Sequence, residues 1–573
     1  MTRPRRSAGS LWCWWFAVVP ALAVAQASPR PVPVGVESCA RLLPPKVSIS
    51  AGPWAYAHLW SLLQKQGYVL RAVRIRRINV YNLARPGENL WYTRLVDFLH
   101  IKTRTSTVRV LLFLHAGQAV RARTVYENER FLRSLGFLRN AVVVPVDCHQ
   151  RKVTARVITY DAWTLKLDVK FGRVGGSNET RYKLVDTNFL GFGKTIGIGR
   201  ATTLERSETI YEYKDPALLG SRWQGQFFYD QLSDGARRIV DVGRPFLRDT
   251  TPVAWNFAEL DQQENLQIYD HGALADLVPW DEKSLTASYG RLYAARGSTF
   301  DRLFLVARVE DDTYGVPTAV DQPALDATIP QPDRREHGLG LGWQSYQDRF
   351  ASFENIRYIG RVEDYDLGWN MSARLLFDPT FLGSSATGWA GRFAASDGWR
   401  VGSHGLLLGH FTLVGQSLDG RLENGVLRTD LTLYEQTWPF QTLVLHGAYA
   451  GEVHPFPENF LYLGGANGLR GYPNFFRIGT QRWITTVEDR IVTPIVLLHT
   501  FEIGFVAYAD AGAVRRLSPG GWSRIFADVG GGLRLGNLRG AYGQVLYFTL
   551  AWPLVRTPNV PSHQFVVGDQ VRF

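Results

Sequence analysis

From about residue 165 to residue 573, apolar residues alternate with polar or small ones in short segments, which are separated by breaks rich in Gly, Asn or Asp. Every second residue from Ile525 to Leu535 is apolar or glycine, and the residues from Phe501 to Ala509 repeat this pattern. A strand with one face towards lipid and the other towards water has this two-residue period. A soluble sandwich also alternates, but rarely over so many segments without splitting into domains. The pattern therefore predicts a mainly β chain, with a transmembrane barrel of about 16 strands over residues 165–573.

Such a barrel must close on itself, because an open sheet edge in lipid leaves backbone amide and carbonyl groups without partners. We expect the first strand at about residues 164–171 and the last at about residues 564–573. The last segment places Phe565, Val567, Val571 and Phe573 on one face. We interpret these four residues as a C-terminal strand signal.

The N-terminal residues have the pattern of a signal peptide. Arg3, Arg5 and Arg6 precede an apolar run over residues 11–25, and small residues follow at 23, 25 and 27. We expect residues 1–27 to be removed and residues 28–69 to form a proline-rich linker with a short helix at 54–66. No later segment reaches the roughly 18 uncharged apolar residues of a membrane-spanning helix. The chain is therefore expected to be secreted, periplasmic or a barrel of the outer membrane.

Two of the three cysteines, Cys39 and Cys148, follow the signal peptide. They either close a disulfide in an oxidising compartment or remain as free thiols. Their spacing from histidines does not suggest a zinc site, and we expect no bound metal.

Residues 70–164 read as one small α+β domain, with strands at 73–82, 140–147 and 152–163 and a helix at 124–137. Residues 71–170 carry 15 Arg and 4 Lys against 7 Asp and Glu, an excess as large as the net charge of +12 of the whole chain. This basic domain either meets anionic headgroups or acidic clients, or is a solvated surface with scattered ion pairs. Export argues against nucleic acid as a partner.

The sequence contains one near match to a nucleotide-binding motif. Residues 188–195, NFLGFGKT, resemble a phosphate-binding loop, but Asn188 replaces its first glycine and a strand follows in place of a helix. Neither a G-x-S-x-G elbow nor an H-E-x-x-H pair is present. We therefore expect neither an enzyme nor a cofactor.

Residues 464–473, GGANGLRGYP, place four glycines and one arginine between two strand-like segments. Residues 486–490, TVEDR, and 506–514, VAYADAGAV, follow this loop. Together with the small domain at 111–163 and the hairpin at 184–199, these motifs resemble the BamA/TamA superfamily, the bacterial surface antigen family. Its members are outer-membrane barrels with periplasmic POTRA domains. The resemblance covers about residues 70–573 and implies one POTRA domain at 70–164, where the principal assembly protein has several.

The resemblance also implies the roles of particular residues. Arg470, followed by Gly471 and Tyr472, would be the tip of a loop that returns into the lumen, with Glu488 and Asp510 as the partners of the arginine. The period of two independently places Asp510 on the face opposite the apolar one. Glu488 and Asp510 are 22 residues apart, which suits neighbouring antiparallel strands. The alternative is a flexible surface loop with a solvated arginine.

By resemblance, the chain is expected to be an outer-membrane assembly or translocation protein with its N-terminal domain in the periplasm. It would insert or export client proteins through a weak seam between its first and last strands. Expected partners are unfolded outer-membrane or secreted clients, outer-membrane lipids, and periplasmic chaperones or accessory lipoproteins. One alternative is a two-partner secretion transporter for a single client, in which the helix at 54–66 would imitate a plug. Another is a barrel pore or a barrel enzyme.

Overall fold

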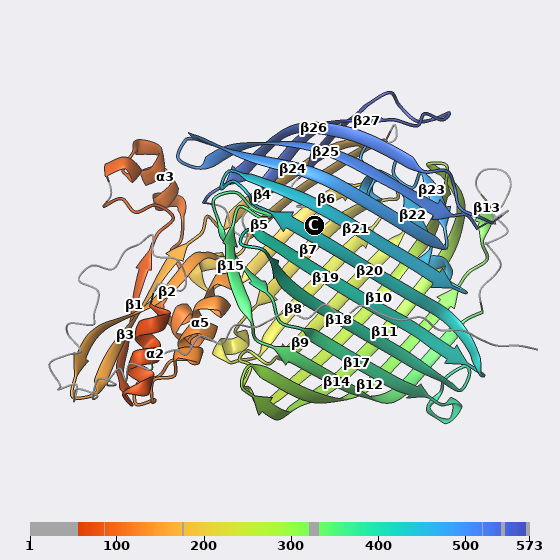
Figure 1. The fold of residues 1–573 in the computed structure, drawn as a ribbon. Coiled ribbons are helices and arrows are strands. Elements are labelled where there is room, and N and C mark those ends of the chain that lie inside the picture. The colour runs from red at the N-terminus through yellow and green to blue at the C-terminus, as the bar shows by residue number, and fades with distance from the viewer. Residues whose placement is uncertain are drawn as a thin grey trace, which may run out of the picture.

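The computed structural model describes residues 56–84, 86–174, 177–319, 332–517, 520–539 and 545–568. The predicted signal peptide, Cys39, Val571 and Phe573 lie outside these residues. A small module of helices and strands sits at one end of a large barrel (Figure 1). We call that end of the barrel the module end and the opposite end the far end.

The barrel is a closed antiparallel sheet in which β28 pairs with β4. Its strands are β4 (Leu165–Val174), β5 (Ser177–Asp186), β6 (Thr195–Thr202), β7 (Ser207–Asp215), β8 (Gln224–Leu232), β9 (Gly235–Arg244), β10 (Val253–Asp270), β11 (Ala273–Arg296), β12 (Thr299–Tyr314), β13 (Thr318–Ala319), β14 (Arg334–Gln347), β17 (Asn370–Asp378), β18 (Gly388–Val401), β19 (Gly405–Leu418), β20 (Arg421–Glu435), β21 (Gln441–Val453), β24 (Gln481–Leu497), β25 (Phe501–Arg515), β26 (Phe526–Asn537), β27 (Val545–Pro553) and β28 (Gln564–Gly568). Two small sheets lie outside this order. They are β15 (Phe350–Glu354) with β16 (Val362–Asp366), and β22 (Leu461–Leu463) with β23 (Arg477–Gly479).

In the described part of the chain the barrel contains 20 strands and the two-residue β13. This number differs from the prediction of about 16, which allowed for long connections at one end. Tight turns occur at both ends instead. His271 and Gly272 join β10 to β11 with φ of 54° and 78°, as a two-residue hairpin turn requires. At the module end, Gly297 and Ser298 join β11 to β12.

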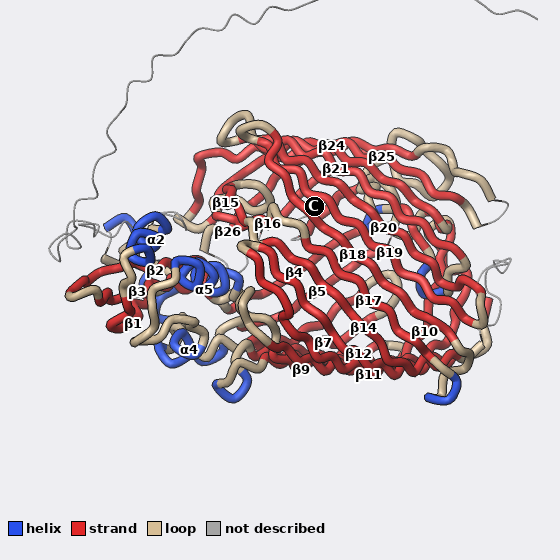
Figure 2. Tube along the Cα trace, turned by 60° about the horizontal axis from the view of Figure 1, so that its bottom comes forward, coloured by secondary structure: helices blue, strands red, loops and turns tan. Residues whose placement is uncertain are grey.

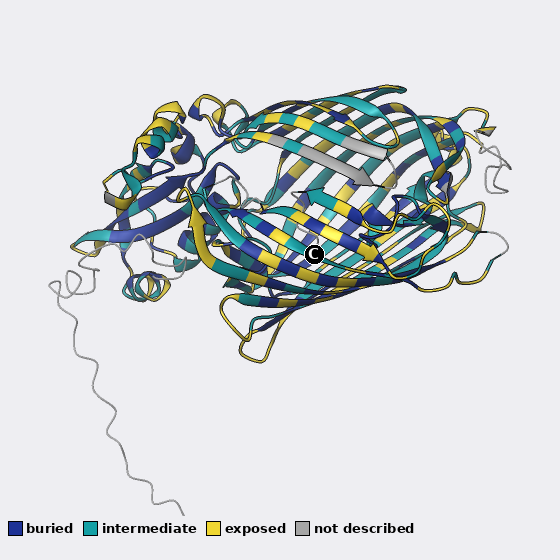
Figure 3. Ribbon diagram, turned by 90° about the horizontal axis from the view of Figure 1, so that it is seen from above, coloured by how far each residue is buried: buried dark blue, intermediate teal, exposed yellow. Residues whose placement is uncertain are grey.

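Residues that differ in burial alternate along the strands of the barrel (Figure 3). In β26, Val529 and Leu533 are exposed, whereas Asp528 and Arg534 are buried, in agreement with the predicted two-residue period. The exposed Leu305, Leu341 and Leu375 lie directly opposite one another on β12, β14 and β17. The outer face is thus apolar at these positions, whereas Asp528 and Arg534 face the lumen.

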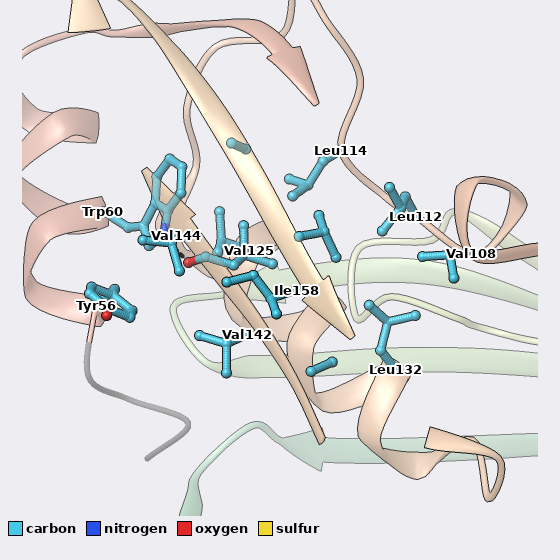
Figure 4. Close-up of a cluster of buried hydrophobic side chains, with 14 of the residues drawn as sticks. Tyr56, Trp60, Val108, Leu112, Leu114, Val125, Leu132, Val142, Val144 and Ile158 are labelled. Carbon is cyan, nitrogen blue, oxygen red and sulfur yellow. Dashed lines mark hydrogen bonds between the residues drawn. The ribbon is translucent and has the colours of Figure 1, made fainter. Parts of the chain in front are cut away.

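The module has a three-stranded sheet in the order β1 (Val69–Ile78), β3 (Lys152–Asp161), β2 (Leu138–His149). Its helices are α2 (Ala57–Lys65), α3 (Trp91–Leu99), α4 (Thr105–Val110) and α5 (Ala122–Ser134). Helix α2 falls within the predicted linker, yet Trp60 is buried in the module core and its indole N–H donates to the Val143 carbonyl at 2.8 Å (Figure 4). The packed module therefore begins before residue 70.

Cys148, at the end of β2, is disulfide-bonded. Because Cys39 lies outside the described residues, the pairing of these two cysteines stays a prediction.

Helices α2, α4 and α5 gather beside the module end of the barrel (Figure 2). Ion pairs join α5 to barrel turns: Arg123 and Arg130 both reach Asp348 at 2.7 Å, and Arg123 also contacts Asp249 at 3.3 Å. Part of the positive charge of the module is thus paired with acids of the barrel. None of the helices in the described ranges is long and apolar enough to cross a membrane.

The segment that resembles a phosphate-binding loop is the turn between β5 and β6. The Asn188 side chain donates to the Thr103 hydroxyl of the module at 2.9 Å and accepts from the Gly193 amide at 2.7 Å. Asn188 therefore closes this turn against the module, and strand β6 follows, as the sequence predicts.

Candidate functional site in the barrel lumen

The loop between β21 and β24, residues 454–480, packs inside the barrel through apolar side chains. Leu463, Leu469, Tyr472 and Phe476 are buried in one cluster with Val514 and Phe526 of the barrel wall. Arg470 is only 5% exposed. A flexible surface loop with a solvated arginine therefore does not describe this structure.

The structure brings Arg470 together with both of its predicted acidic partners. Its Nε and Nη2 donate to the two Asp510 oxygens at 2.7 and 2.9 Å, and its Nη1 donates to Glu488 at 2.7 Å. The guanidinium also lies 3.2 Å from the ring centroid of Tyr508. Charge-assisted bonds with this two-point geometry are stronger than neutral ones and fix the orientation of the side chain. We call Arg470, Glu488 and Asp510 the lumenal lock.

Gly471 and Tyr472 hold the loop close to the last strands. A Cβ atom at Gly471 would lie 2.7 Å from the Asp528 Cβ and 3.0 Å from the Pro553 nitrogen, so the wall excludes any larger residue. The Tyr472 hydroxyl lies 3.0 Å from the carbonyls of Ala527 and Val555. The Gly471 carbonyl accepts a hydrogen bond of 3.2 Å from the side chain of Gln564, which belongs to β28. The loop thus contacts the strand that closes the barrel.

The lumenal lock continues towards the module end through Arg490. Glu488 accepts from Arg490 Nε at 2.7 Å on its second oxygen, and Arg490 Nη1 donates to the Ile356 carbonyl at 2.9 Å. Ile356 lies in the connection of the β15–β16 hairpin, residues 350–366. Arg534 Nη2 donates to the next carbonyl, that of Arg357, at 2.9 Å. One carboxylate, Glu488, therefore links the far-end loop to this second segment.

The β15–β16 hairpin packs against the inner wall of the barrel near the module end. Its Ile356 and Tyr365 are buried in one cluster with Tyr434 and Val444 of β20 and β21. On its other side, Asp364 accepts from Arg133 of α5 at 2.7 Å. The hairpin is thus held by the barrel and by the module. Helix α2 packs in the module core and has no plug role in this structure.

Sequence reasoning missed several of these residues. Arg490 is two residues after Glu488 on the same strand, so the two-residue period was a sufficient signal to place it in the lumen. Asp528 was missed in the same way, although it lies directly opposite Asp510 on β26. No local signal marks Gln564, because its contact with the loop depends on how the barrel closes.

The residues of the predicted C-terminal signal are only partly described. Phe565 is exposed on β28, opposite Leu550, and Val567 lies opposite Phe548. Val571 and Phe573 lie outside the described residues. Within the described residues, β28 pairs with β27 over residues 564–568.

No protein-family profile matches the sequence, and no curated protein matches it. Among solved structures, the chain is similar to BamA from Haemophilus ducreyi lacking POTRA domains 1–3, with 13% identity, a TM-score of 0.37, and coverage of 86% of this chain and 84% of that one. It is also similar to CdiB from Acinetobacter baumannii, with 12% identity, a TM-score of 0.41, and coverage of 88% and 74%. For CdiB from Escherichia coli the identity is 11%, the TM-score 0.45, and the coverage 96% and 91%.

Proposed function

We propose that the chain is an outer-membrane protein that inserts or exports client proteins, and that the β4–β28 seam is where the barrel opens. The apolar outer surface of the barrel supports a location in a membrane. In this proposal the N-terminal module is a POTRA domain in the periplasm, where it meets clients, with or without chaperones and accessory lipoproteins. No catalytic step, cofactor or nucleotide is part of the proposal.

The observation that carries this proposal is the contact between the far-end loop and the closing strand. Arg470 anchors the loop on two buried acids, and the neighbouring Gly471 carbonyl accepts from Gln564 of β28. Because β28 is the strand that closes the barrel onto β4, release of the seam would have to break this bond between Gln564 and Gly471.

An open seam would present unpaired backbone donors and acceptors to a client. A client strand could add to this edge by β-augmentation, with main-chain hydrogen bonds replacing those between β4 and β28. Folding of the client would supply the free energy. The lumenal lock would keep β24 and β25 in place while the seam opens, because its acids lie on these two strands.

The β15–β16 hairpin favours a second candidate, a two-partner secretion transporter that threads one client through the lumen. A threading client would have to displace the hairpin from the module end. The ion pair between Arg133 and Asp364 connects the hairpin to the module, which a client would meet first. Binding of a client to the module could thereby release the hairpin.

Depletion of the protein from its host separates these candidates. Assembly predicts that many outer-membrane barrel proteins fall in abundance together. Secretion predicts that one exported protein disappears while the others remain. If neither class changes and the purified protein conducts ions at a steady level, the protein is a pore and the proposal is wrong.

A further inference from the structure

Helix α3 exposes a stripe of large apolar side chains. Trp91 is 77% exposed and Phe98 is 84% exposed, and Leu95 and Leu99 are exposed as well. Positions 91, 95, 98 and 99 recur with the spacing of one helical face. Exposed apolar side chains are ordinary when they are scattered, but a contiguous set of this size marks an interaction surface.

The opposite face of α3 is fixed to the module by polar contacts. Thr93 is fully buried, and its hydroxyl lies 2.7 Å from the Glu88 carbonyl. The Asp97 carboxylate accepts from the Tyr81 amide at 3.0 Å. These contacts determine which face of the helix points outwards, so the exposure of the apolar stripe does not result from a loosely attached helix.

Helix α3 also lies close to the module end of the barrel (Figure 1). The Tyr92 hydroxyl is 2.8 Å from His499 Nδ1, and the Tyr81 hydroxyl is 2.7 Å from the Thr500 hydroxyl. His499 and Thr500 form the turn between β24 and β25. Just before this turn, β24 ends in exposed apolar residues that include Ile495 and Leu497. The stripe on α3 therefore lies next to the apolar outer surface of the barrel.

We propose that α3 is an interfacial membrane helix. Its Trp91, Leu95 and Phe98 side chains lie among the acyl chains of the leaflet that surrounds the module end of the barrel. Arg94 is exposed at the edge of the stripe, and its Nε donates to Asn89 Oδ1 at 2.6 Å; the outer part of its guanidinium would meet the lipid phosphates. Tryptophan at one end of such a helix suits the boundary between headgroups and acyl chains. This inference rests on the proposed membrane location of the barrel and not on its transport function.

Lipid is favoured over a protein partner by the position of the stripe. The polar contacts to His499 and Thr500 hold α3 at the rim of the barrel, where the bilayer must end if the barrel spans it. If the barrel spans a bilayer, a second copy or another protein on this face would have to displace the lipid beside the barrel wall. The helix would also hold the module at a fixed height relative to the bilayer.

Site-directed spin labelling of the mature full chain tests this proposal. A nitroxide label is attached at Leu95→Cys or, in a second variant, at Phe98→Cys, and the protein is reconstituted into vesicles of phosphatidylcholine and phosphatidylglycerol. Collision rates with oxygen, which concentrates in the bilayer, and with a water-soluble nickel chelate are compared by electron paramagnetic resonance. A label at Leu305→Cys on the apolar barrel surface reports on lipid, and a label at the exposed His58→Cys of α2 reports on water. The protein without an added cysteine gives the background.

The proposal predicts that labels at residues 95 and 98 have an oxygen-to-nickel ratio several-fold above that of the label at residue 58, and close to that at residue 305. Water-like ratios at 95 and 98 with a lipid-like ratio at 305 would overturn this inference and leave the proposed function intact. Water-like ratios at all of these positions would overturn both. Labels shielded from both reagents and broadened by a neighbouring label would show a second copy on this face, and would also contradict the proposal.

Discussion

The guanidinium of Arg470 meets the Asp510 carboxylate through two parallel hydrogen bonds, with Nε 2.7 Å from Oδ2 and Nη2 2.9 Å from Oδ1. Both side chains are buried, and Glu488 binds the third nitrogen of the same guanidinium. Loss of the cation would leave the buried Asp510 carboxylate without its cation, and Glu488 with Arg490 alone. The net attraction within the pair is therefore less important than the cost of breaking it, because breaking it would leave a buried charge without a partner.

We expect Arg470→Ala to destabilise the folded barrel by about 3–5 kcal/mol, the usual cost of removing one partner from a buried ion pair. Arg470→Lys should fall between this variant and the native protein, because lysine keeps the charge but loses the two-point geometry. The readout is the temperature at which the barrel loses its fast mobility on gels of unheated samples. Arg421→Ala, at the exposed first residue of β20, is the control. Equal transition temperatures for the Arg470 and Arg421 variants would contradict the lumenal lock.

The two aspartates that face each other on β25 and β26 should respond differently to neutralisation. Asp510 accepts from Arg470 and from the Thr486 hydroxyl at 2.7 Å, so Asp510→Asn should lower the transition temperature. Asp528 has no ion pair within the described ranges, and it lies opposite a second carboxylate. Asp528→Asn should therefore leave the transition temperature unchanged or raise it, because it removes a like charge. A lower transition temperature for Asp528→Asn would show that this carboxylate has a stabilising role.

Removal of the β15–β16 hairpin should open the lumen at the module end. Replacing residues 350–366 by a short turn is expected to increase single-channel conductance in planar bilayers, because Ile356 and Tyr365 no longer fill the space beside Tyr434. Trimming the exposed Asp419–Gly420 turn between β19 and β20 is the matched control. Unchanged conductance after removal of the hairpin would mean that other segments close the lumen.

Docking of the module should weaken as the pH rises, because of Glu127. Burial, together with the nearby Asp249 carboxyl, raises the pKa of this α5 carboxyl to about 8. In the docked state this carboxyl binds its proton more tightly than a solvated carboxyl, whose pKa is 4.5. Protonation of Glu127 therefore stabilises docking fully below pH 4.5, and this stabilisation is lost as the pH rises through about 8. Hydrogen exchange of α5 should therefore accelerate between about pH 6 and 9.

Glu127→Gln serves as the control for this pH dependence, since an amide cannot ionise. Burial also raises the pKa of Glu129 to about 8, but Glu129 is present in both proteins, so the difference between them isolates Glu127. Identical pH profiles for the native protein and Glu127→Gln would rule out this carboxyl as the cause.

The sequence predicted the barrel wall and its two faces, because the two-residue period is a local property that each strand carries by itself. It also predicted the partners of Arg470, although through resemblance rather than through packing. The β15–β16 hairpin was not foreseen. Residues 350–354 and 362–366 have the composition of barrel strands, and no local pattern distinguishes a strand in the wall from one that packs against it. Helix α2 was missed as part of the module because its partner Val143 is about 80 residues away.

The central claim, that clients enter the membrane at the β4–β28 seam, is tested most directly with purified protein in liposomes. The measurement is the rate at which an unfolded outer-membrane barrel protein becomes resistant to protease in the absence of nucleotide. Our account predicts a rate several-fold above that of empty liposomes, and its loss when a disulfide joins β4 to β28. An unaltered rate with the seam cross-linked, or no acceleration by the native protein, would contradict it.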